Sequence, residues 1–487
     1  MPLRNLVWLL VIPGLVGLGL AVGATAPPPD QDYELIHRVA LVLAEVDRSY
    51  VRELNEKERE EFVKRMINGG LRWLDPNSVY LDEKDLQQFD RENAGSFEGV
   101  GVLLENEGEK KKYLKILHVI AGSPAYEAGL VVHDEIVKVG DEPTEGMTYA
   151  EALSKIKGER NTKVTLTVRR GGRKPAEFAM TVTRGRIADH PVTGVSRLAS
   201  DPREWNWFID PANKIGYVRV STFNDLTAKE LKEAVEKLDA AGAKGLIIDL
   251  RDNGGGLLKQ AIAVADLFLP AGKIVTTKDR RGGEHTDTAG GSGTIFQPAD
   301  RKPIVVLVNH DSASASEIVA AALQDNGRAV VVGTRTYGKG SVQSTFRLGE
   351  RQETAVKLTT QTWWRPSGKN MDRHGAPKDR PDEWGVFPDA SLGVEMTDTE
   401  YRRYLFELGK QQYVAGRPEV VAEVFGSDPP RPPLTVPKGE DGKPLWDESK
   451  PFEDPQLKRA LDHLRKTITG VGVAPGKGVF PAVGSPA

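Results

Sequence analysis

Residues 304–323 read IVVLVNHDSASASEIVAAAL, and this stretch decides the fold around it. The apolar run 304–308 predicts a buried strand, and the apolar run 318–323 predicts a helix. Mostly small residues lie between the two runs, and they predict a tight turn. Such a turn would let the backbone of a substrate come close to one hydroxyl group.

A lysine between two glycines follows a second strand-like run, Ala329–Val332, in the segment Gly338-Lys339-Gly340. A serine at a strand-to-helix turn with a lysine on the next strand suggests a serine hydrolase that uses the lysine as its base. The lysine must be neutral for this role, which burial and a scarcity of nearby acids favour. Gln343 lies four residues on, on the same face of a strand, and could hold the amine. The alternative is a solvated surface lysine.

Three serines compete for the role of nucleophile. Ser314 lies just before the expected helix, where backbone N–H groups point outward and favour developing negative charge. Ser316 suits a helix cap or a first-turn position. The alternative is that Ser312, Ser314 and Ser316 all cap or pack the turn.

Composition excludes several classes of site. The chain has 487 residues, with 66 basic and 69 acidic side chains and a net charge of -3, which gives no reason to expect a nucleic-acid partner. It has no cysteine, so disulfides, zinc–thiolate sites and a cysteine nucleophile are excluded. No metal or organic cofactor is implied.

The N-terminal segment reads as an export signal or a membrane anchor. Arg4 precedes an uncharged stretch, 5–29, that is mostly apolar from Leu6 to Val22. Ala24-Thr25-Ala26 has the form of a cleavage site, but Pro27 is a poor residue after the cleaved bond. Both a cleaved signal and an uncleaved anchor therefore fit, and both predict a location in the periplasm or cell envelope.

Two further patterns describe the rest of the chain. Apolar residues at helical spacing predict helices near 35–46 and 56–74, a small helical module that could serve dimerisation. From residue 187 to about 400, strand-like runs such as 215–218 and 245–250 alternate with helical stretches such as 226–241. That alternation predicts an α/β core with parallel strands and crossover helices.

The region between these two patterns resembles a PDZ domain with a circularly permuted strand order. It opens with Gly99-Val100-Gly101-Val102 and continues as short strands, with a helix expected from Tyr149 to Lys157. Amides around residues 99–102 could capture a chain-terminal carboxylate while the bound peptide adds as a strand to a sheet edge. The alternative is a packing module that binds no ligand.

Three segments together resemble the C-terminal processing (tail-specific) peptidases, the S41-type serine proteases. They are 312–318, Gln324-Asp325 and 337–343, with shorter matches between residues 33 and 465. The resemblance implies a crotonase-like, ClpP-like α/β core. It assigns the nucleophile to Ser314, the base to Lys339 and a supporting role to Gln343. Asp325 matches an aspartate sometimes included in the site, and we expect it to be structural.

The resemblance also implies an oxyanion hole. The turn Arg251-Asp252-Asn253-Gly254-Gly255-Gly256 matches a family motif, and we expect the amides of Gly255 and Ala315 to be the donors. Two departures are Asn77, where many members carry histidine, and a lengthened stretch from Arg373 to Gly385, which could alter the rim of the cleft.

Three rival motifs fit the chain less well. Residues 333–339 nearly make a phosphate-binding loop, but Gly340 and a strand-like continuation break that pattern. Ser154-Lys155-Ile156-Lys157 has Ser-x-x-Lys spacing on a polar helix and reads as a solvated face. A Ser-His-Asp triad using His310 lacks a Gly-x-Ser-x-Gly motif, and that histidine is expected to be structural.

The combined prediction is an exported serine endopeptidase that grips protein C-terminal tails and cleaves them through an acyl-enzyme. The alternatives are a non-catalytic PDZ scaffold with an inactive core and a hydrolase of small esters or lactams. The partners are protein or peptide substrates, and homo-oligomerisation stays open. The expected modules are a signal or anchor (1–30), a helical module (31–95), a PDZ domain (96–186), a protease core (187–400) and a C-terminal helical region with a disordered tail (401–487).

Overall fold

The computed structural model describes residues 30–105, 113–290, 294–296, 302–374 and 383–470. The expected export segment up to residue 29 and the expected disordered tail after residue 470 lie outside these ranges. Within them, no helix has both the length and the apolar character needed to cross a membrane. Contacts divide the chain into two compact units, Met1–Pro76 and Asn77–Ala487.

The first unit contains two helices, α2 (Asp30–Ser49) and α3 (Glu56–Leu74). Asn55 caps α3, since its side chain accepts from the Glu58 amide while the Glu58 carboxylate accepts from the Asn55 amide. The helix ends before Pro76, as the sequence predicts. No residue of α3 is buried, and Trp73 is 86 % exposed, so the unit by itself has little core.

The second unit begins with β1 (Val79–Leu81) and α4 (Glu83–Ala94) and then forms the PDZ region. Helix α4 falls within the expected helical module (31–95), but its contacts place it in the second unit. The PDZ region has a sheet with strand order β3-β4-β5-β7-β8, in which β3 is an end strand. Its elements are β2 (Ser96–Gly99), β3 (Val102–Leu104), β4 (Leu114–Val119), α5 (Pro124–Ala128), β5 (Glu135–Val139), β6 (Glu142–Pro143), α6 (Tyr149–Ile156), β7 (Lys163–Arg170), β8 (Ala176–Thr183) and β9 (Gly185–Ala188).

The PDZ region is an insertion with its own core. Strands β2 and β9 pair antiparallel, from Ser96 opposite Ala188 to Gly99 opposite Gly185, so the chain enters and leaves the region at one place. Inside it, Ile116, Leu130 and Leu166 are fully buried. The expected PDZ-like α+β architecture is confirmed.

The core sheet has the order β10-β14-β15-β18-β19, with β13 beside β14. Strands β14, β15, β18 and β19 are parallel, which the alternation of strand and helix patterns predicts. Its strands are β10 (Val192–Thr193), β13 (Phe208–Asp210), β14 (Ile215–Val220), β15 (Gly245–Asp249), β18 (Ile304–Val308) and β19 (Val330–Gly333).

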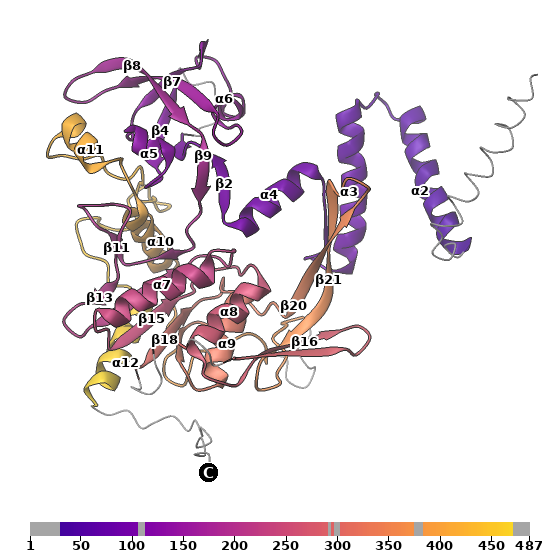
Figure 1. The fold of residues 1–487 in the computed structure, drawn as a ribbon. Helices are drawn as coiled ribbons and strands as arrows, with labels where there is room; N and C mark the ends of the chain where they lie inside the picture. The colour runs from indigo at the N-terminus through magenta and orange to yellow at the C-terminus, as the bar shows by residue number, and fades with distance from the viewer. Residues whose placement is uncertain (1–29, 106–112, 291–293, 297–301, 375–382, 471–487) are drawn as a thin grey trace, which may run out of the picture. The chain divides into compact units, whose positions relative to one another are not determined.

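Helices cover both faces of this sheet. Three of them, α7 (Thr227–Ala240), α8 (Leu258–Phe268) and α9 (Ala315–Asp325), lie side by side and bury one set of strand residues (Figure 1). The other set, which includes Ile247 and Leu307, packs against α12 (Pro455–Thr469). Because successive strand side chains point to opposite faces, strands buried on both sides are apolar along most of their length. The α/β core is confirmed.

A second sheet and the remaining short elements complete the unit. The second sheet has the order β1-β21-β16-β17, and β20 pairs with β21. The elements not yet given are β11 (Ser196–Arg197), β12 (Trp205–Asn206), β16 (Lys273–Asp279), β17 (Glu284–Thr288), β20 (Ser341–Leu348), β21 (Thr354–Trp364), α10 (Asp398–Gln412) and α11 (Pro418–Phe425).

Candidate active site

Ser314 lies in the turn between β18 and α9, at the residue that precedes the helix. Its φ of +56° and ψ of -112° are strained for a residue with a side chain. The two neighbouring serines are fully buried, and their hydroxyls are used inside the protein. Ser312 Oγ donates to the Leu250 carbonyl at 2.8 Å, and Ser316 Oγ donates to the Asn253 carbonyl at 2.8 Å. Ser314 alone of the three is partly exposed.

The turn that follows β15 packs directly against Ser314. The Asn253 carbonyl also accepts the Ala313 amide at 3.0 Å, so main-chain and hydroxyl bonds join the two turns. Gly255 has a φ of +105°, and a Cβ placed there would lie 2.8 Å from Ser314 Cβ. Only glycine fits so close an approach.

The two expected oxyanion donors, the amides of Ala315 and Gly255, differ in whether they already donate a hydrogen bond within the protein. The Ala315 amide is at the first position of α9, where helical geometry leaves an N–H without an intrahelical acceptor. The Gly255 amide lies near it, since a Cβ on Gly255 would be 3.1 Å from the Ala315 nitrogen. However, the Gly255 N–H donates to Asn253 Oδ1 at 2.9 Å. It must release that acceptor to bind an oxyanion.

Glu317 joins the serine turn to the lysine segment. Its side chain is fully buried, and one oxygen, Oε2, accepts the Ser314 amide at 2.8 Å and the Lys339 amide at 2.9 Å. The other oxygen accepts Thr336 Oγ1 at 2.6 Å and the Gly338 amide at 2.7 Å. A single carboxylate oxygen therefore separates the backbones of the expected nucleophile and the expected base.

This role of Glu317 was missed in the sequence. Ser314 and Glu317 have the Ser-x-x-Glu spacing of a capping box, which could have indicated the bond to the Ser314 amide. No sequence signal indicated the bonds to residues 336–339. Burial raises the pKa of Glu317, and the hydrogen bonds from Thr336 and the three amides oppose that rise.

The segment around Lys339 is held by tight packing. A Cβ on Gly338 would lie 2.6 Å from a ring carbon of Trp384, and a Cβ on Gly340 would lie 2.6 Å from Asp372. The Lys339 carbonyl accepts the indole N–H of Trp363 at 2.7 Å. The described ends of the lengthened stretch 373–385 thus lie against Gly338, and Asp372, the residue before that stretch, lies against Gly340.

Gln343 and Lys339 were expected to share one face of a strand, but only Gln343 lies in a strand. Strand β20 begins only at Ser341, and its register with β21 shifts between Val342 and Gln343. The Gln343 amide donates to Ser341 Oγ at 2.9 Å and to Thr359 Oγ1 at 3.1 Å. The Asn77 amide donates to the same Ser341 hydroxyl at 3.3 Å. Both side chains thus support the start of the strand that follows the lysine.

Asp325 is at the last position of α9, an 11-residue helix that places it about 15 Å from Ser314. Its carboxylate forms an ion pair with Arg365 and accepts the Ser367 amide at 3.0 Å. These contacts fit the structural role expected for it.

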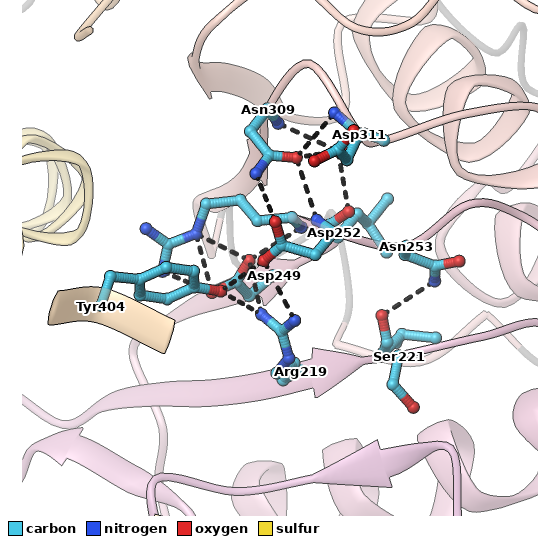
Figure 2. Close-up of polar contacts among 12 residues, drawn as sticks. Arg219, Ser221, Asp249, Asp252, Asn253, Asn309, Asp311 and Tyr404 are labelled. Atoms are coloured by element: carbon cyan, nitrogen blue, oxygen red, sulfur yellow. Dashed lines mark hydrogen bonds and ion pairs between the residues drawn. The ribbon is translucent and has the colours of Figure 1, made fainter. Parts of the chain in front are cut away.

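A buried ionic network lies beneath the turn after β15 (Figure 2). Arg251 pairs with Asp249 at 2.7 Å and with Asp454 at 2.8 Å, and Arg219 lies 3.7 Å from Asp249. Burial alone would raise the pKa of Asp249, but the two guanidinium groups hold it below its ordinary value. The start of the turn is thereby fixed to the core sheet.

Main-chain hydrogen bonds hold the PDZ loop at residues 99–102, where carboxylate binding is expected. Gly101 has a φ of +89°, and its carbonyl accepts the Ile120 amide at 3.0 Å and Ser123 Oγ at 3.2 Å. The Val100 carbonyl accepts the Ala125 amide at 2.8 Å. Strand β3, which starts at Val102, pairs with β4 through Val102 opposite Val119. As the end strand of its sheet, β3 has the geometry that peptide addition requires.

The rival motifs do not form sites of their own. Lys339 is followed by strand β20 rather than the helix that a phosphate-binding loop requires. Ser154 is exposed and its hydroxyl donates to the Glu151 carbonyl. His310 is 66 % exposed and lies 3.2 Å from the Asp311 carboxylate. Among the described residues, no three histidine or acidic side chains gather where they could hold a metal ion.

Comparison with known proteins identifies the family. The model of peptidase family S41 matches residues 214–382, and a PDZ-domain model matches residues 115–170. The chain is 31 % identical to a carboxy-terminal-processing protease of Bartonella bacilliformis over 94 % of both chains. It is 35 % identical to the carboxy-terminal processing protease CtpA of Bacillus subtilis, over 69 % of this chain and 68 % of that one. A solved structure of a photosystem II D1 C-terminal processing protease aligns over 73 % of this chain and 86 % of that one, at 27 % identity and a TM-score of 0.37.

The chain therefore belongs to peptidase family S41, the C-terminal processing proteases, and carries the PDZ domain that its sequence predicts.

Proposed function

We propose that this protease is a serine endopeptidase in which Ser314 is the nucleophile and Lys339 is its base. The observation that carries the proposal is the shared contact at Glu317, whose Oε2 accepts the amides of both residues. This contact brings together two segments that are 25 positions apart in the sequence. The burial of the Ser312 and Ser316 hydroxyls also favours Ser314 as the nucleophile.

The proposed reaction follows from these positions. Ser314 Oγ attacks the peptide carbonyl, and neutral Lys339 accepts the hydroxyl proton and later gives it to the leaving amine. The Ala315 amide stabilises the oxyanion, and the Gly255 amide joins it after leaving Asn253 Oδ1. Water then hydrolyses the acyl-enzyme, with Lys339 again taking a proton.

Substrate selection is assigned to the PDZ domain. We propose that amides within Gly99-Val100-Gly101-Val102 bind the terminal carboxylate of a substrate, while its tail pairs with the outer edge of β3. The end position of β3 and the matching PDZ model support this assignment. The protein would then cut polypeptides whose C-terminal tails are accessible.

The test compares four proteins on an unfolded substrate with an apolar C-terminus. Ser314→Ala and Lys339→Ala should each abolish cleavage. The matched control is Ser154→Ala with Lys157→Ala, which removes a serine and a lysine from the expected solvated face and should leave cleavage unchanged. Equal cleavage by wild type and both site variants would end the assignment and favour a tail-binding scaffold for this region.

Amidation of the substrate tail should weaken binding, and unchanged binding and rate would refute the role of the PDZ domain.

The location is part of the proposal. The apolar residues between Leu6 and Val22 lead us to propose export to the periplasm or cell envelope. Cell fractionation of the full chain tests this, and recovery of the protein only in the cytoplasmic fraction would refute it.

A further inference from the structure

Asp252 lies in the turn 251–256 that carries Gly255, and donors from three elements contact its carboxylate. Oδ1 accepts Asn309 Nδ2 at 2.7 Å and the Tyr401 hydroxyl at 2.8 Å. Oδ2 accepts the Tyr404 hydroxyl at 3.0 Å, and an Arg219 nitrogen lies 3.4 Å from it. Figure 2 shows Asp252 between Asn309 above and Arg219 and Tyr404 below.

The two tyrosines come from α10, which lies beyond the residues that the S41 family model matches. The hydroxyl of Tyr404 donates to Asp252 and accepts from Arg219, so both of its hydrogen-bonding functions are used. The hydroxyl of Tyr401 also approaches Asp311 Oδ2 at 3.3 Å, in the serine turn. Helix α10 therefore contacts Asp252 in one turn and Asp311 at the edge of the other.

The backbone of Asp252 needs such support. Its φ of +59° is in the left-handed region, which residues with side chains adopt at a cost. Its amide donates to Asn309 Oδ1 at 2.9 Å, and the next residue, Asn253, makes the bonds to Ala313 and Ser316 that join the two turns. The conformation of Asp252 thus fixes the direction in which residues 253–256 leave the strand.

We propose that Asp252 is a positioning residue for the reaction at Ser314, and that the hydroxyls of Tyr401 and Tyr404 hold it in place. The proposal rests on the proposed function of Ser314. When both hydroxyls are absent, Asp252 keeps only its bonds to Asn309 and Arg219, and the strained turn relaxes. Gly255, which lies against Ser314, then moves away from the position in which its amide can serve the oxyanion.

Removal of the hydroxyls need not remove the packing of the rings. The Tyr404 ring lies under the Arg251 guanidinium, 4.3 Å from its centroid, and phenylalanine keeps this stacking. The ion pairs of Arg251 with Asp249 and Asp454 do not involve tyrosine. Tyr401→Phe therefore removes contacts to the two turns only, whereas Tyr404→Phe also removes an acceptor of Arg219 in the network beneath.

The experiment uses the full chain with Tyr401→Phe, Tyr404→Phe and the double variant. The control is Tyr413→Phe, because the Tyr413 hydroxyl is buried and has no hydrogen-bond partner among the described residues. We expect the double variant to have a kcat lower by about 10-fold to 100-fold, with KM within about 2-fold of wild type. Labelling of Ser314 by a fluorophosphonate should slow in parallel, and the control should match wild type.

Two results would overturn the inference. One is a double variant whose kcat and labelling rate equal those of wild type. The other is a fall in kcat that the fraction of unfolded protein, measured by thermal unfolding, fully explains. If the double variant does not fold, the two single variants decide by the same criteria. The Ser314→Ala variant separates this inference from the proposed function: cleavage by that variant ends the proposed function, whereas its inactivity beside a normal double variant ends only the role of Asp252.

Discussion

Glu317→Gln is the sharpest test of how the site is held together. Each carboxylate oxygen of Glu317 accepts two hydrogen bonds, from Thr336 and Gly338 at one oxygen and from Ser314 and Lys339 at the other. Glutamine has nearly the same shape, but one of its two positions is an NH₂ group that can only donate. With the NH₂ group at the Ser314 and Lys339 amides, two donors of the protein face a third donor. In the other orientation only the Gly338 amide does, because the Thr336 hydroxyl can turn and accept.

The magnitude follows from these bonds. A hydrogen bond to a charged group contributes about 1.5–3 kcal/mol, so the loss of one or two corresponds to about 1.5–6 kcal/mol. Part of this is offset, because burial raises the pKa of Glu317 and so the charged form carries a cost that glutamine avoids. We expect a net loss of about 3 kcal/mol, divided between a lower free energy of unfolding and weaker stabilisation of the transition state. If most of this loss affects the transition state, kcat/KM falls about 100-fold.

The assay measures peptide hydrolysis, fluorophosphonate labelling of Ser314 and the unfolding midpoint on the same preparations. The matched control is Glu58→Gln, since Glu58 also accepts the amide three residues before it at a helix start, but in the first unit. The control should keep wild-type activity. A folded Glu317→Gln protein with wild-type kcat/KM and labelling would refute the reasoning.

Three further predictions address other parts of the chain. Gly255→Ala should abolish labelling of Ser314, because a Cβ would lie 2.8 Å from Ser314 Cβ at a φ of +105°; normal labelling would contradict the close packing. Asp325→Asn should lower the unfolding midpoint through loss of the Arg365 ion pair while kcat stays within about 3-fold of wild type; a large loss of kcat in folded protein would argue for a catalytic role. Burial lowers the pKa of His118 to about 4 from its ordinary 6.5, so the unfolded chain binds more protons between these values and stability falls as pH falls from 6.5 to 4. Denaturant unfolding should show a loss of about 3 kcal/mol in unfolding free energy over this pH range, and His118→Gln should not show this loss. The same pH dependence of stability in wild type and variant would contradict the prediction.

The fold class and the family were predictable from the sequence because both depend on local patterns. The apolar run 304–308 and the small residues after it predict the strand and turn that the structure has, and the ends of α3 and α6 fall within one residue of the prediction. The S41 family and the PDZ domain were also predicted correctly from short motifs.

What the sequence did not predict depends on contacts between distant segments. Tyr404 and Asp252 are 152 positions apart, and no local pattern links them. Gln343 was placed by strand alternation, but the strand starts after Lys339 and carries a register shift. Glu317 was visible within the motif, yet three of its four donors are recognisable only once residues 336–339 are placed beside it.

The position of Glu317 also bears on the charge of the lysine. A carboxylate near an amine ordinarily stabilises the ammonium form and raises its pKa, which would oppose the proposed base. Here the carboxylate already accepts four hydrogen bonds, two at each oxygen, and a carboxylate has about four acceptor sites. Its acceptor capacity is therefore used by three main-chain amides and one hydroxyl. Glu317 thus holds the lysine segment through its main chain, while its charge still opposes the neutral amine that the proposed mechanism requires.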